Sequence, residues 1–227
     1  MINKKFSLVL MGLILNFLFL TKPTYSQITV DNILSTDGEV YGSLINENTM
    51  YINGSFQNVG YATGNLAFID SATANPNLSF PKVDGEINDI EPDGMGGWFV
   101  AGRFENIGGF AIKNLANIRS DFSVNTLFAP NPNYVVYTIK VNGGTLYLGG
   151  EFTEVGGATR NCIASINALT GQVTSWNPNI TGQGARVRSI AVSDDGNTIY
   201  AGGQFSKVGS TTRNNLASID LSGNVTT

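Results

Sequence analysis

Short stretches of alternating apolar and polar residues recur along the chain, and each ends at a cluster of turn-forming residues. Residues 136–141 (VYTIKV) and 187–192 (VRSIAV) are two such stretches. The first is followed by Asn142-Gly143-Gly144 and the second by residues 194–197 (DDGN). Alternation with a period of two is typical of half-buried strands, and Asn-Gly and Asp-Gly tolerate the positive φ angles of tight hairpins. The pattern therefore predicts an all-β chain built from hairpins.

The second strand of each predicted hairpin carries a repeated motif. Residues 147–157 read YLGGEFTEVGG, and altered copies occupy residues 51–60, 99–109 and 200–209. The phenylalanines of the four copies are separated by 48, 48 and 53 residues, a period typical of repeat architectures. We therefore interpret the motif positions as packing positions rather than as a binding loop. They are Tyr51, Gly54, Phe56, Phe99, Gly102, Phe104, Tyr147, Gly149, Gly150, Phe152, Tyr200, Gly202, Gly203 and Phe205.

Two further pieces complete each repeat. The third piece is residues 162–166, with counterparts at 66–69, 115–118 and 216–219. The fourth is residues 172–176, which ends before a proline that cannot donate a hydrogen bond to a sheet ladder. An aromatic residue precedes the proline segment in three repeats, and we interpret these residues as plugs between units. They are Phe80, Phe128 and Trp176.

Four strands in about fifty residues predict a β-propeller-like array of about four blades, and a solenoid of stacked hairpins is the alternative. The approximate blades are residues 36–83, 84–132, 133–179 and 180–227. The fourth repeat stops without its aromatic-Asn-Pro segment. Either a strand at residues 28–30 completes it and closes a ring, or the sequence is a fragment of a longer chain with further blades. The second interpretation is favoured because the sequence stops within a repeat.

The first 26 residues have the features of a secretory signal peptide. Lys4 and Lys5 precede an apolar run at residues 6–20, and Thr24-Tyr25-Ser26 offers small residues for cleavage before Gln27. The alternative is a membrane anchor, but fifteen apolar residues are short for a span of about 20. We therefore expect a secreted or cell-surface protein whose mature chain, residues 27–227, does not insert into the membrane.

Charge and composition narrow the possible functions. The formal net charge is −4, and removal of Lys4, Lys5 and Lys22 with the signal peptide would bring it to −7. An acidic chain without a basic cluster is not expected to bind nucleic acid. The sequence has no histidine and a single cysteine, Cys162, so an imidazole base and a zinc site are not expected. We interpret Cys162 as a small buried residue at the repeat position of Leu66 and Leu115.

Acidic residues offer the remaining candidates for chemistry. Glu86, Asp89 and Glu91 alternate with isoleucines on a predicted strand, and Asp194-Asp195 lies in a turn. Paired carboxylates can hydrolyse glycosides, but both groups also suit a half-exposed strand and a hairpin turn. Calcium at Asp93, Asp194 or Asp195 lacks the spacing of a calcium loop. We therefore predict no catalytic residue, no metal and no cofactor.

Two basic residues, Arg160 and Arg213, precede the third piece of their repeats by similar intervals, two and three residues. Repeated placement indicates an ion pair between blades or a contact with a backbone carbonyl group. A role that faces a ligand is the alternative interpretation.

With these residues in view, the chain resembles the secreted bacterial β-propeller family of delta-60-type repeats, a domain of unknown function. Residues 147–178 match nearly all of the family's unit, including Arg160-Asn161 and Thr170-Gly171. Repeats one and two depart from it, because Asn53 and Ala101 replace the first glycine. The resemblance implies a propeller fold and an extracellular location, and it implies no activity.

A second resemblance concerns residues 165–176, which are similar to the tryptophan-docking motif of quinoprotein dehydrogenase propellers. The tryptophan here follows the glycine by five residues instead of four. We interpret the likeness as shared packing between blades, without quinone binding.

Two functional hypotheses follow. The first is a non-catalytic extracellular module that binds a protein or a polysaccharide, or acts as a scaffold, with loops such as residues 61–64 and 179–185 as contact candidates. The second is a carbohydrate-active or oxidoreductase propeller enzyme with a site at the channel mouth.

Overall fold

The computed structural model describes residues 39–46, 49–55, 58–59, 61–62, 65–75, 77 and 79–226. The predicted signal peptide, the strand predicted at residues 28–30 and the motif residue Phe56 lie outside these ranges. The secondary structure of the described residues consists of strands and turns, without a helix. Within them, no helix is long and apolar enough to cross a membrane.

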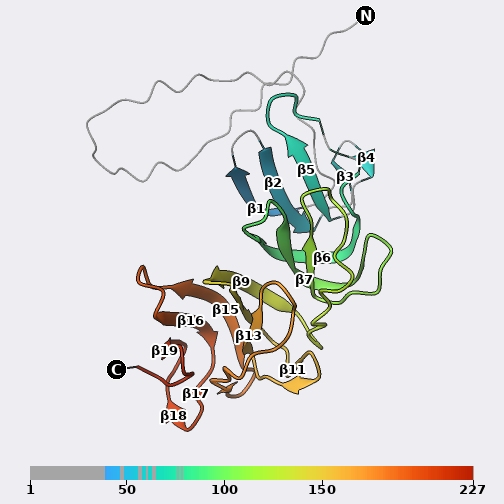
Figure 1. The fold of residues 1–227 in the computed structure, drawn as a ribbon. Helices are drawn as coiled ribbons and strands as arrows, with labels where there is room; N and C mark the ends of the chain where they lie inside the picture. Colours follow the sequence, from blue (N-terminus) through green and yellow to red (C-terminus); the bar gives the residue numbers. More distant parts are fainter. Residues whose placement is uncertain are drawn as a thin grey trace, which may run out of the picture. The chain divides into compact units, whose positions relative to one another are not determined.

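Four antiparallel sheets follow one another along the sequence, as the colours of Figure 1 show. In each sheet the second strand lies between the first and the third. The strands of the first two sheets are β1 (Glu39–Asn46), β2 (Thr49–Ser55) and β5 (Leu66–Asp70), then β6 (Val83–Pro92), β7 (Trp98–Ile107) and β8 (Leu115–Ile118). Those of the other two are β9 (Val136–Asn142), β10 (Thr145–Gly150) and β13 (Ile163–Asn167), then β15 (Arg186–Val192), β16 (Thr198–Gln204) and β19 (Leu216–Asp220). Each of these four sheets corresponds to one of the four repeats that the sequence predicts, so we call them blades one to four.

The second glycine of the repeated motif lies at a β-bulge in every blade. The pairing register shifts where the first strand meets Gly54, Gly102, Gly150 and Gly203. A Cβ atom at these glycines would lie only 1.9 to 2.2 Å from a backbone oxygen of the chain at the start of the first strand. No side chain fits at that distance, so glycine is required for the bulge to close.

The fourth piece of each repeat is much shorter than predicted. It pairs with the third strand through one isolated bridge, Ile118 with Val124, Ile166 with Val173 and Ile219 with Val225. The prediction of four full strands is therefore wrong in the described blades two to four, which have three strands and a bridge. Next to the bridge, the backbone N–H groups of Thr174 and Thr226 donate to the oxygens of Ser165 and Ser218, at 3.0 and 2.8 Å. The side-chain hydroxyls of the same two pairs also bond each other.

Short hairpins connect the second and third strands within blades one, three and four. The Val-Gly turn after the motif forms β3 (Asn58–Val59) with β4 (Tyr61–Ala62), and β11 (Glu154–Val155) with β12 (Ala158–Thr159). In blade four, β17 (Lys207–Val208) lies between β14 (Ile180–Thr181) and β18 (Thr211–Thr212). Ile180 is fully buried, so the predicted contact loop 179–185 is in part a core element.

The apolar core lies between consecutive blades. One buried cluster joins Phe99, Ala101 and Leu115 of blade two to Val136 and Ile139 of blade three. The predicted aromatic plugs sit at these boundaries. Phe80 contacts Phe68 of blade one and Trp98 of blade two, and the indole nitrogen of Trp176 donates to the carbonyl oxygen of Asp220 in blade four, at 2.9 Å. Face-to-face packing of repeated antiparallel sheets makes this an all-β, propeller-like fold.

Cys162 occupies a different repeat position from the one predicted. Its φ is 62°, and the residues with the same backbone hydrogen bonds are Asn114 (φ 60°) and Asn215 (φ 65°). Ile163, one residue later, is the counterpart of Leu115 and Leu216. The prediction was wrong by one residue because it compared hydrophobicity, whereas the left-handed conformation, which asparagine tolerates well, defines the position.

We expect the Cys162 thiol to be inert in the folded chain. It is buried and its S–H donates to the carbonyl oxygen of Ala185, at 3.2 Å. Burial raises the pKa of the thiol to about 11, and the Glu151 carboxylate adds to the rise. At about pH 8 the thiolate fraction is therefore roughly one in a thousand. Ellman's reagent should leave the native chain unmodified and should titrate one thiol in guanidinium chloride, and rapid labelling without denaturant would contradict the burial.

Candidate functional site

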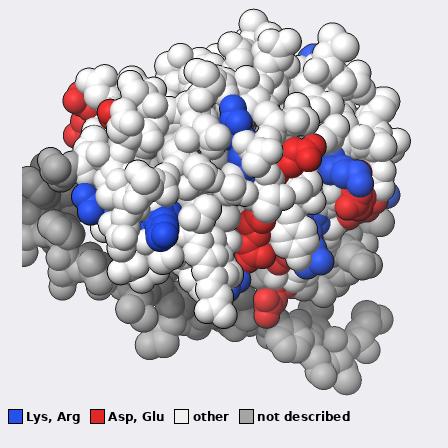
Figure 2. All heavy atoms as spheres, turned by 90° about the horizontal axis from the view of Figure 1, so that it is seen from below, with Lys and Arg blue, Asp and Glu red and all other residues white. Residues whose placement is uncertain are grey.

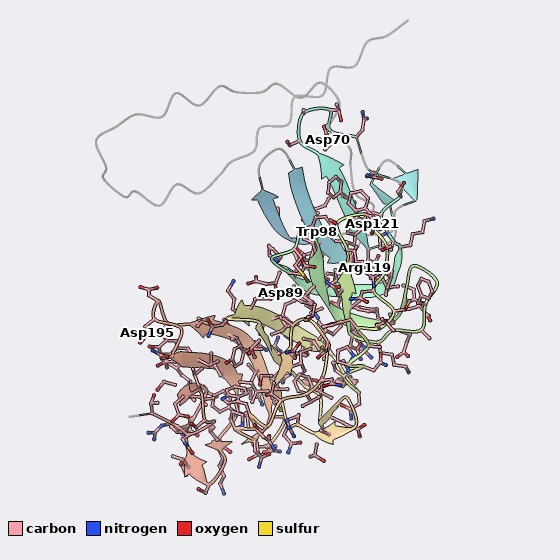
Figure 3. All side chains as sticks on the ribbon, viewed as in Figure 1. Asp70, Asp89, Trp98, Arg119, Asp121 and Asp195 are labelled. Atoms are coloured by element: carbon pink, nitrogen blue, oxygen red, sulfur yellow. The ribbon has the colours of Figure 1, made fainter. Side chains whose placement is uncertain are left out.

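A groove of about 540 Å³ lies between the outer turns of blades two and three. Its lining comes from the turn after β6, from β8 and the segment that follows it, and from the turn after β13. The lining residues are Asp93, Met95, Asn117, Arg119, Ser120, Asn125, Leu127, Leu169 and Thr170. Figure 3 labels Arg119 close to Trp98 and Asp121 at this part of blade two. Of these residues, only Asp93 was a candidate from the sequence, as a calcium ligand.

A chain of hydrogen bonds fixes the polar side chains of the groove. Asp93 accepts the backbone N–H groups of Met95 and Gly97 through one carboxylate oxygen, both at 2.8 Å. The other oxygen accepts from the side-chain amide NH₂ of Asn117 at 3.1 Å. The side-chain oxygen of Asn117 in turn accepts from the side-chain NH₂ of Asn125 at 3.0 Å. Arg119 then donates to the Asn125 side-chain oxygen at 2.7 Å and to the backbone oxygen of Val124 at 3.2 Å. The groove thus presents a preorganised row of donors and acceptors.

Blade two departs from the repeat at these positions. In the other blades the residue after the third strand's last apolar position is Asp70, Asn167 or Asp220, and each accepts backbone N–H groups of its own turn. Blade two has Arg119 there instead. Its pair Asn117 and Asn125 also replaces the hydroxyl pairs of blades three and four. Blade two therefore has an arginine and two asparagines where blades three and four have one short acid or amide and two hydroxyl residues, which bond only near their own turn.

Phe122 marks the same departure in the backbone. Its φ is 67°, in the left-handed region where the equivalent turn positions of blades three and four are Gly171 and Gly223. A bulky residue is disfavoured in this conformation. Its ring stacks on Trp98 with centroids 5.9 Å apart and 9° between planes, and it also packs against Phe68 and Phe80. Aromatic packing therefore stabilises a turn that glycine forms in blades three and four.

Apolar side chains project beside the polar row. Met95 is 62% exposed, Leu127 87% and Leu169 67%. Single exposed apolar residues are ordinary, but three around one groove are typical of a binding surface. The charged lining residues are one acid, Asp93, and one base, Arg119, so the lining has no net charge. The arrangement suits a ligand that is neutral, rich in hydrogen-bonding groups and partly apolar.

The predicted acidic candidates have structural partners. Asp89 of β6 accepts the N–H of Ile90 at 2.9 Å through one oxygen and that of Ile139 in β9 at 2.8 Å through the other. Glu91 forms an ion pair with Lys140 at 2.7 Å. Asp89 and Glu91 thus both lie against the edge of β9. Glu86 is not part of this network of hydrogen bonds and ion pairs. Figure 3 labels Asp89 and Asp195 in different blades.

Asp195 serves its own turn. It accepts from the Ser193 hydroxyl at 2.5 Å and from the Asn197 N–H at 3.0 Å, and these bonds lower its pKa to about 2. Among the described residues, no three acidic or cysteine side chains are grouped in a way that would hold a metal ion.

Asp89 should make folding stability fall as the pH rises. Burial raises its pKa above the ordinary 3.8, and the neighbouring Glu91 adds to the rise. The folded chain therefore keeps this proton to a higher pH than the unfolded chain, so the stability from the protonated form is full below about pH 4 and is lost as the pH rises through the raised pKa. We expect Asp89→Asn to remove this loss, so that its free energy of unfolding improves relative to the unsubstituted chain as the pH rises above about 4.

Asp195→Asn is the matched comparison, because the lowered pKa of Asp195 reverses the sign. Its deficit in stability should be present above about pH 4 and should shrink as the pH falls toward about 2. Urea unfolding across the pH range measures both effects. A pH-independent difference between Asp89→Asn and the unsubstituted chain would contradict the raised pKa.

The repeated arginines contact backbone carbonyl groups, as one of the two predictions stated. Arg160 donates to the oxygens of Thr174 at 2.6 Å and Thr159 at 2.8 Å, and Arg213 donates to Thr212 at 3.3 Å. Both contacts lie within one blade. The Nε atom of Arg160 is buried without a hydrogen-bond partner.

In blades two, three and four, the extra residue of the bulge on the first strand contacts a neighbouring blade, a feature that the sequence did not reveal. The Asn88 amide donates to the Val136 oxygen at 3.0 Å, and the Arg188 guanidinium lies 5.1 Å from the centre of the Tyr137 ring. Glu151 accepts from the Tyr137 hydroxyl and from Arg186, both at 2.8 Å. These contacts tie the first strands of blades two, three and four together.

The surface in Figure 2 carries few charges, and its Lys and Arg side chains are interspersed with Asp and Glu. Among the described residues, Lys113 and Glu105 form an exposed ion pair at 2.5 Å. On this face there is no extended basic stripe of the kind that follows a phosphate backbone.

Comparisons with known proteins give structural likeness only. No family model matches the chain, and no curated protein matches it. The chain is similar to the computationally designed Ika4 protein, with a TM-score of 0.49, 10% identity, and coverage of 83% of this chain and 97% of that one. It is also similar to the designed Ika8 protein (TM-score 0.48, 10% identity, 85% and 63% coverage) and to the WD40 β-propeller domain of Doa1 (0.43, 10%, 85% and 69%). The propeller-like description therefore rests on the sheets, bulges and interfaces described above.

Proposed function

We propose that the chain is an exported, non-catalytic binding module of propeller type, and that the groove around Arg119 binds a neutral oligosaccharide or polysaccharide. The proposal of export rests on the signal-peptide features of residues 1–26. The proposal of binding rests on one observation. Where the other blades have an acid or amide turn residue, and blades three and four a hydroxyl pair, blade two has a connected Asp93–Asn117–Asn125–Arg119 row that lines the groove.

The chemistry of the groove matches that of a sugar. Each hydroxyl group of a sugar both donates and accepts hydrogen bonds, and the row supplies carboxylate, amide and guanidinium partners. The C–H faces of a sugar ring are apolar, and Met95, Leu127 and Leu169 offer apolar contacts at the rim. Because the lining has no net charge, a neutral glycan fits better than an anionic polymer such as a nucleic acid.

Binding can be tested with the purified chain on an array of neutral plant, fungal and bacterial oligosaccharides, followed by calorimetry on any retained glycan. Leu127→Ser and Leu169→Ser should each weaken binding about fivefold or more, the loss expected when roughly 1 kcal/mol of apolar contact is removed. Both side chains are exposed, so melting temperatures should not change. Leu221→Ser is the matched control, because Leu221 is 49% exposed in the corresponding turn of blade four, outside the groove. Retention of no neutral glycan, or equal loss in all three variants, would refute the proposal.

The enzyme hypothesis is less well supported. Both carboxylate oxygens of Asp89 accept backbone N–H groups, and Glu91 is engaged by Lys140, so these acids hold strands together. Neither residue lines the groove described above. Hydrolysis of any array glycan that disappears in Glu91→Gln and persists in Leu127→Ser would restore the enzyme hypothesis.

A further inference from the structure

The turn that follows the third strand is held closed by its own first side chain in blade four. One carboxylate oxygen of Asp220 accepts the backbone N–H groups of Ser222 and Asn224, at 2.9 and 2.8 Å. Asn167 and Asp70 accept N–H groups of their own turns in the same way in blades three and one. A short acid or amide at this position is therefore the cap of the turn.

Arg119 removes this cap from blade two. The turn has the same length as that of blade four, because the N–H of Arg119 donates to the Ser123 oxygen at 2.9 Å as that of Asp220 donates to the Asn224 oxygen at 2.8 Å. A guanidinium group has donors only, so it cannot accept the N–H groups that Asp220 accepts. Asp121 accepts one of them, from Ser123 at 2.9 Å. The cap of blade two is thus reduced from two hydrogen bonds to one.

Phe122 stands where the other turns have a small residue. Its N–H donates to the Arg119 oxygen at 2.9 Å, the bond that Gly171 and Gly223 make in blades three and four. Blade one has Ala74 at this position, also with a positive φ, 56°. A phenylalanine at a φ of 67° is strained, and such strain persists only where the surroundings hold the residue firmly.

The Phe122 ring holds the turn from outside the hydrogen-bond pattern. It lies parallel to the Trp98 indole, with centroids 5.9 Å apart, and edge to face with Phe68 at 4.9 Å. Trp98 in turn pairs with Ile118, the residue before Arg119, across β7 and β8. The stack therefore fastens the far side of the turn to the strand that leads into the arginine.

The guanidinium of Arg119 depends on the part of the turn that Phe122 holds. Its hydrogen bonds end on the three residues that follow Phe122: Ser123 at 3.3 Å, Val124 at 3.2 Å and Asn125 at 2.7 Å. A change in the conformation of Phe122 would move all three acceptors together. The ring thus acts on the groove through Arg119, without lining the groove itself.

We propose that Phe122 is a positioning residue of the groove. Its stack on Trp98 takes over from the missing cap, and this leaves position 119 to an arginine that faces the ligand. The two departures from the repeat, Arg119 and Phe122, are accordingly one coupled change. The ligand-facing part of this role rests on the glycan groove proposed above, whereas the coupling of Phe122 to Arg119 does not.

A stability cycle tests the coupling without any glycan. Phe122→Gly should lower the urea midpoint, because the turn then has neither the ring nor a full cap. The same substitution in the Arg119→Asn chain should cost clearly less, because the introduced amide can accept the N–H groups of the turn as Asn167 does. Equal losses in the two backgrounds would overturn the proposal, since Phe122 would then pack independently of position 119.

Hydrogen exchange measures whether the turn itself opens. In Phe122→Gly, the N–H of Arg119 should exchange about tenfold faster relative to that of Asp220, which makes the equivalent bond in blade four. Phe122→Tyr keeps the ring and should restore the ratio of the unsubstituted chain. An unchanged ratio in Phe122→Gly would contradict the role of the ring, whatever happens to the global stability.

Calorimetry with the neutral oligosaccharide that the array retains tests the ligand-facing part. Phe122→Gly should weaken binding about fivefold or more when Arg119 is present, a coupling typical of residues in one network. In the Arg119→Asn chain it should cause no further loss, and Phe122→Tyr should restore binding. Equal losses in both backgrounds would overturn positioning through Arg119 and leave the groove itself as a site. If no neutral oligosaccharide binds, the proposed function fails, while the stability cycle and hydrogen exchange still decide the coupling.

Discussion

Replacement of Phe152 by alanine is expected to lower the free energy of unfolding by about 3–5 kcal/mol, the usual loss for a buried phenylalanine. Phe152 is fully buried and belongs to the cluster that joins blades two and three. Its ring lies against Gly150, where an added Cβ would be 2.9 Å from Phe152 Cδ1. The surrounding strands are fixed by their hydrogen-bonded pairing, so they can close only partly into the space that the ring leaves. The loss should therefore include the cost of a cavity as well as that of lost burial.

Phe110→Ala is the matched control, because Phe110 lies in a turn of blade two and is 47% exposed. Its effect should be about 0.5 kcal/mol or less. Guanidinium unfolding followed by the fluorescence of Trp98 and Trp176 measures both. A loss below about 1 kcal/mol for Phe152→Ala would mean that the motif phenylalanines are not packing residues.

The periodic features were the most predictable from sequence. The hairpins and the motif recur in all four repeats and the aromatic plugs in three, so several copies of a weak pattern reinforce one another. Trp176 was predicted to pack between blades, and it contacts Tyr147 of its own blade edge to face at 5.1 Å and hydrogen-bonds Asp220 of the next. Each of these features depends on local sequence and on the repeat period alone.

The groove could not be predicted in the same way, because its signal is a departure from the repeat. Arg119, Asn117 and Asn125 are ordinary polar residues until they are compared with Asp220, Ser218 and Thr226, which serve only their own turn. The lining also combines turns of two blades, and no sequence spacing brings Asp93 and Leu169 together. Alignment of turn residues across repeats, in place of apolar residues, would have singled out Arg119. The same alignment would have placed Cys162 correctly beside Asn114 and Asn215.

The bulges were hidden for a related reason. An extra residue on the first strand leaves the apolar alternation nearly intact, so Asn88, Tyr137 and Arg188 read as ordinary strand positions. In the sequence, only the motif glycine on the second strand marks the bulge. The structure explains why this residue is glycine, because a backbone carbonyl group lies directly opposite it.

Gly203→Ala is accordingly expected to destabilise the chain by about 3 kcal/mol, while Gly202→Ala, one residue earlier, is expected to be neutral or slightly stabilising. At Gly203 the new Cβ would lie 2.1 Å from the Arg186 oxygen and 2.9 Å from the Val187 Cα. Both are backbone atoms, so no side-chain rotation can relieve the contact. The bulge would have to open, and Val187 would move away from Gly149, which it covers.

The neighbouring substitution separates this clash from the general effect of glycine in strands. A Cβ on Gly202 meets only one atom, the Asn215 oxygen at 4.0 Å, and alanine restricts the unfolded chain more than glycine does. Both variants differ from the parent by a single methyl group in the same strand, so unfolding in urea compares them directly. Equal stabilities would show that the bulge does not need its glycine. A large difference would assign the second glycine of all four motifs to closure of the bulge, since the four share one geometry.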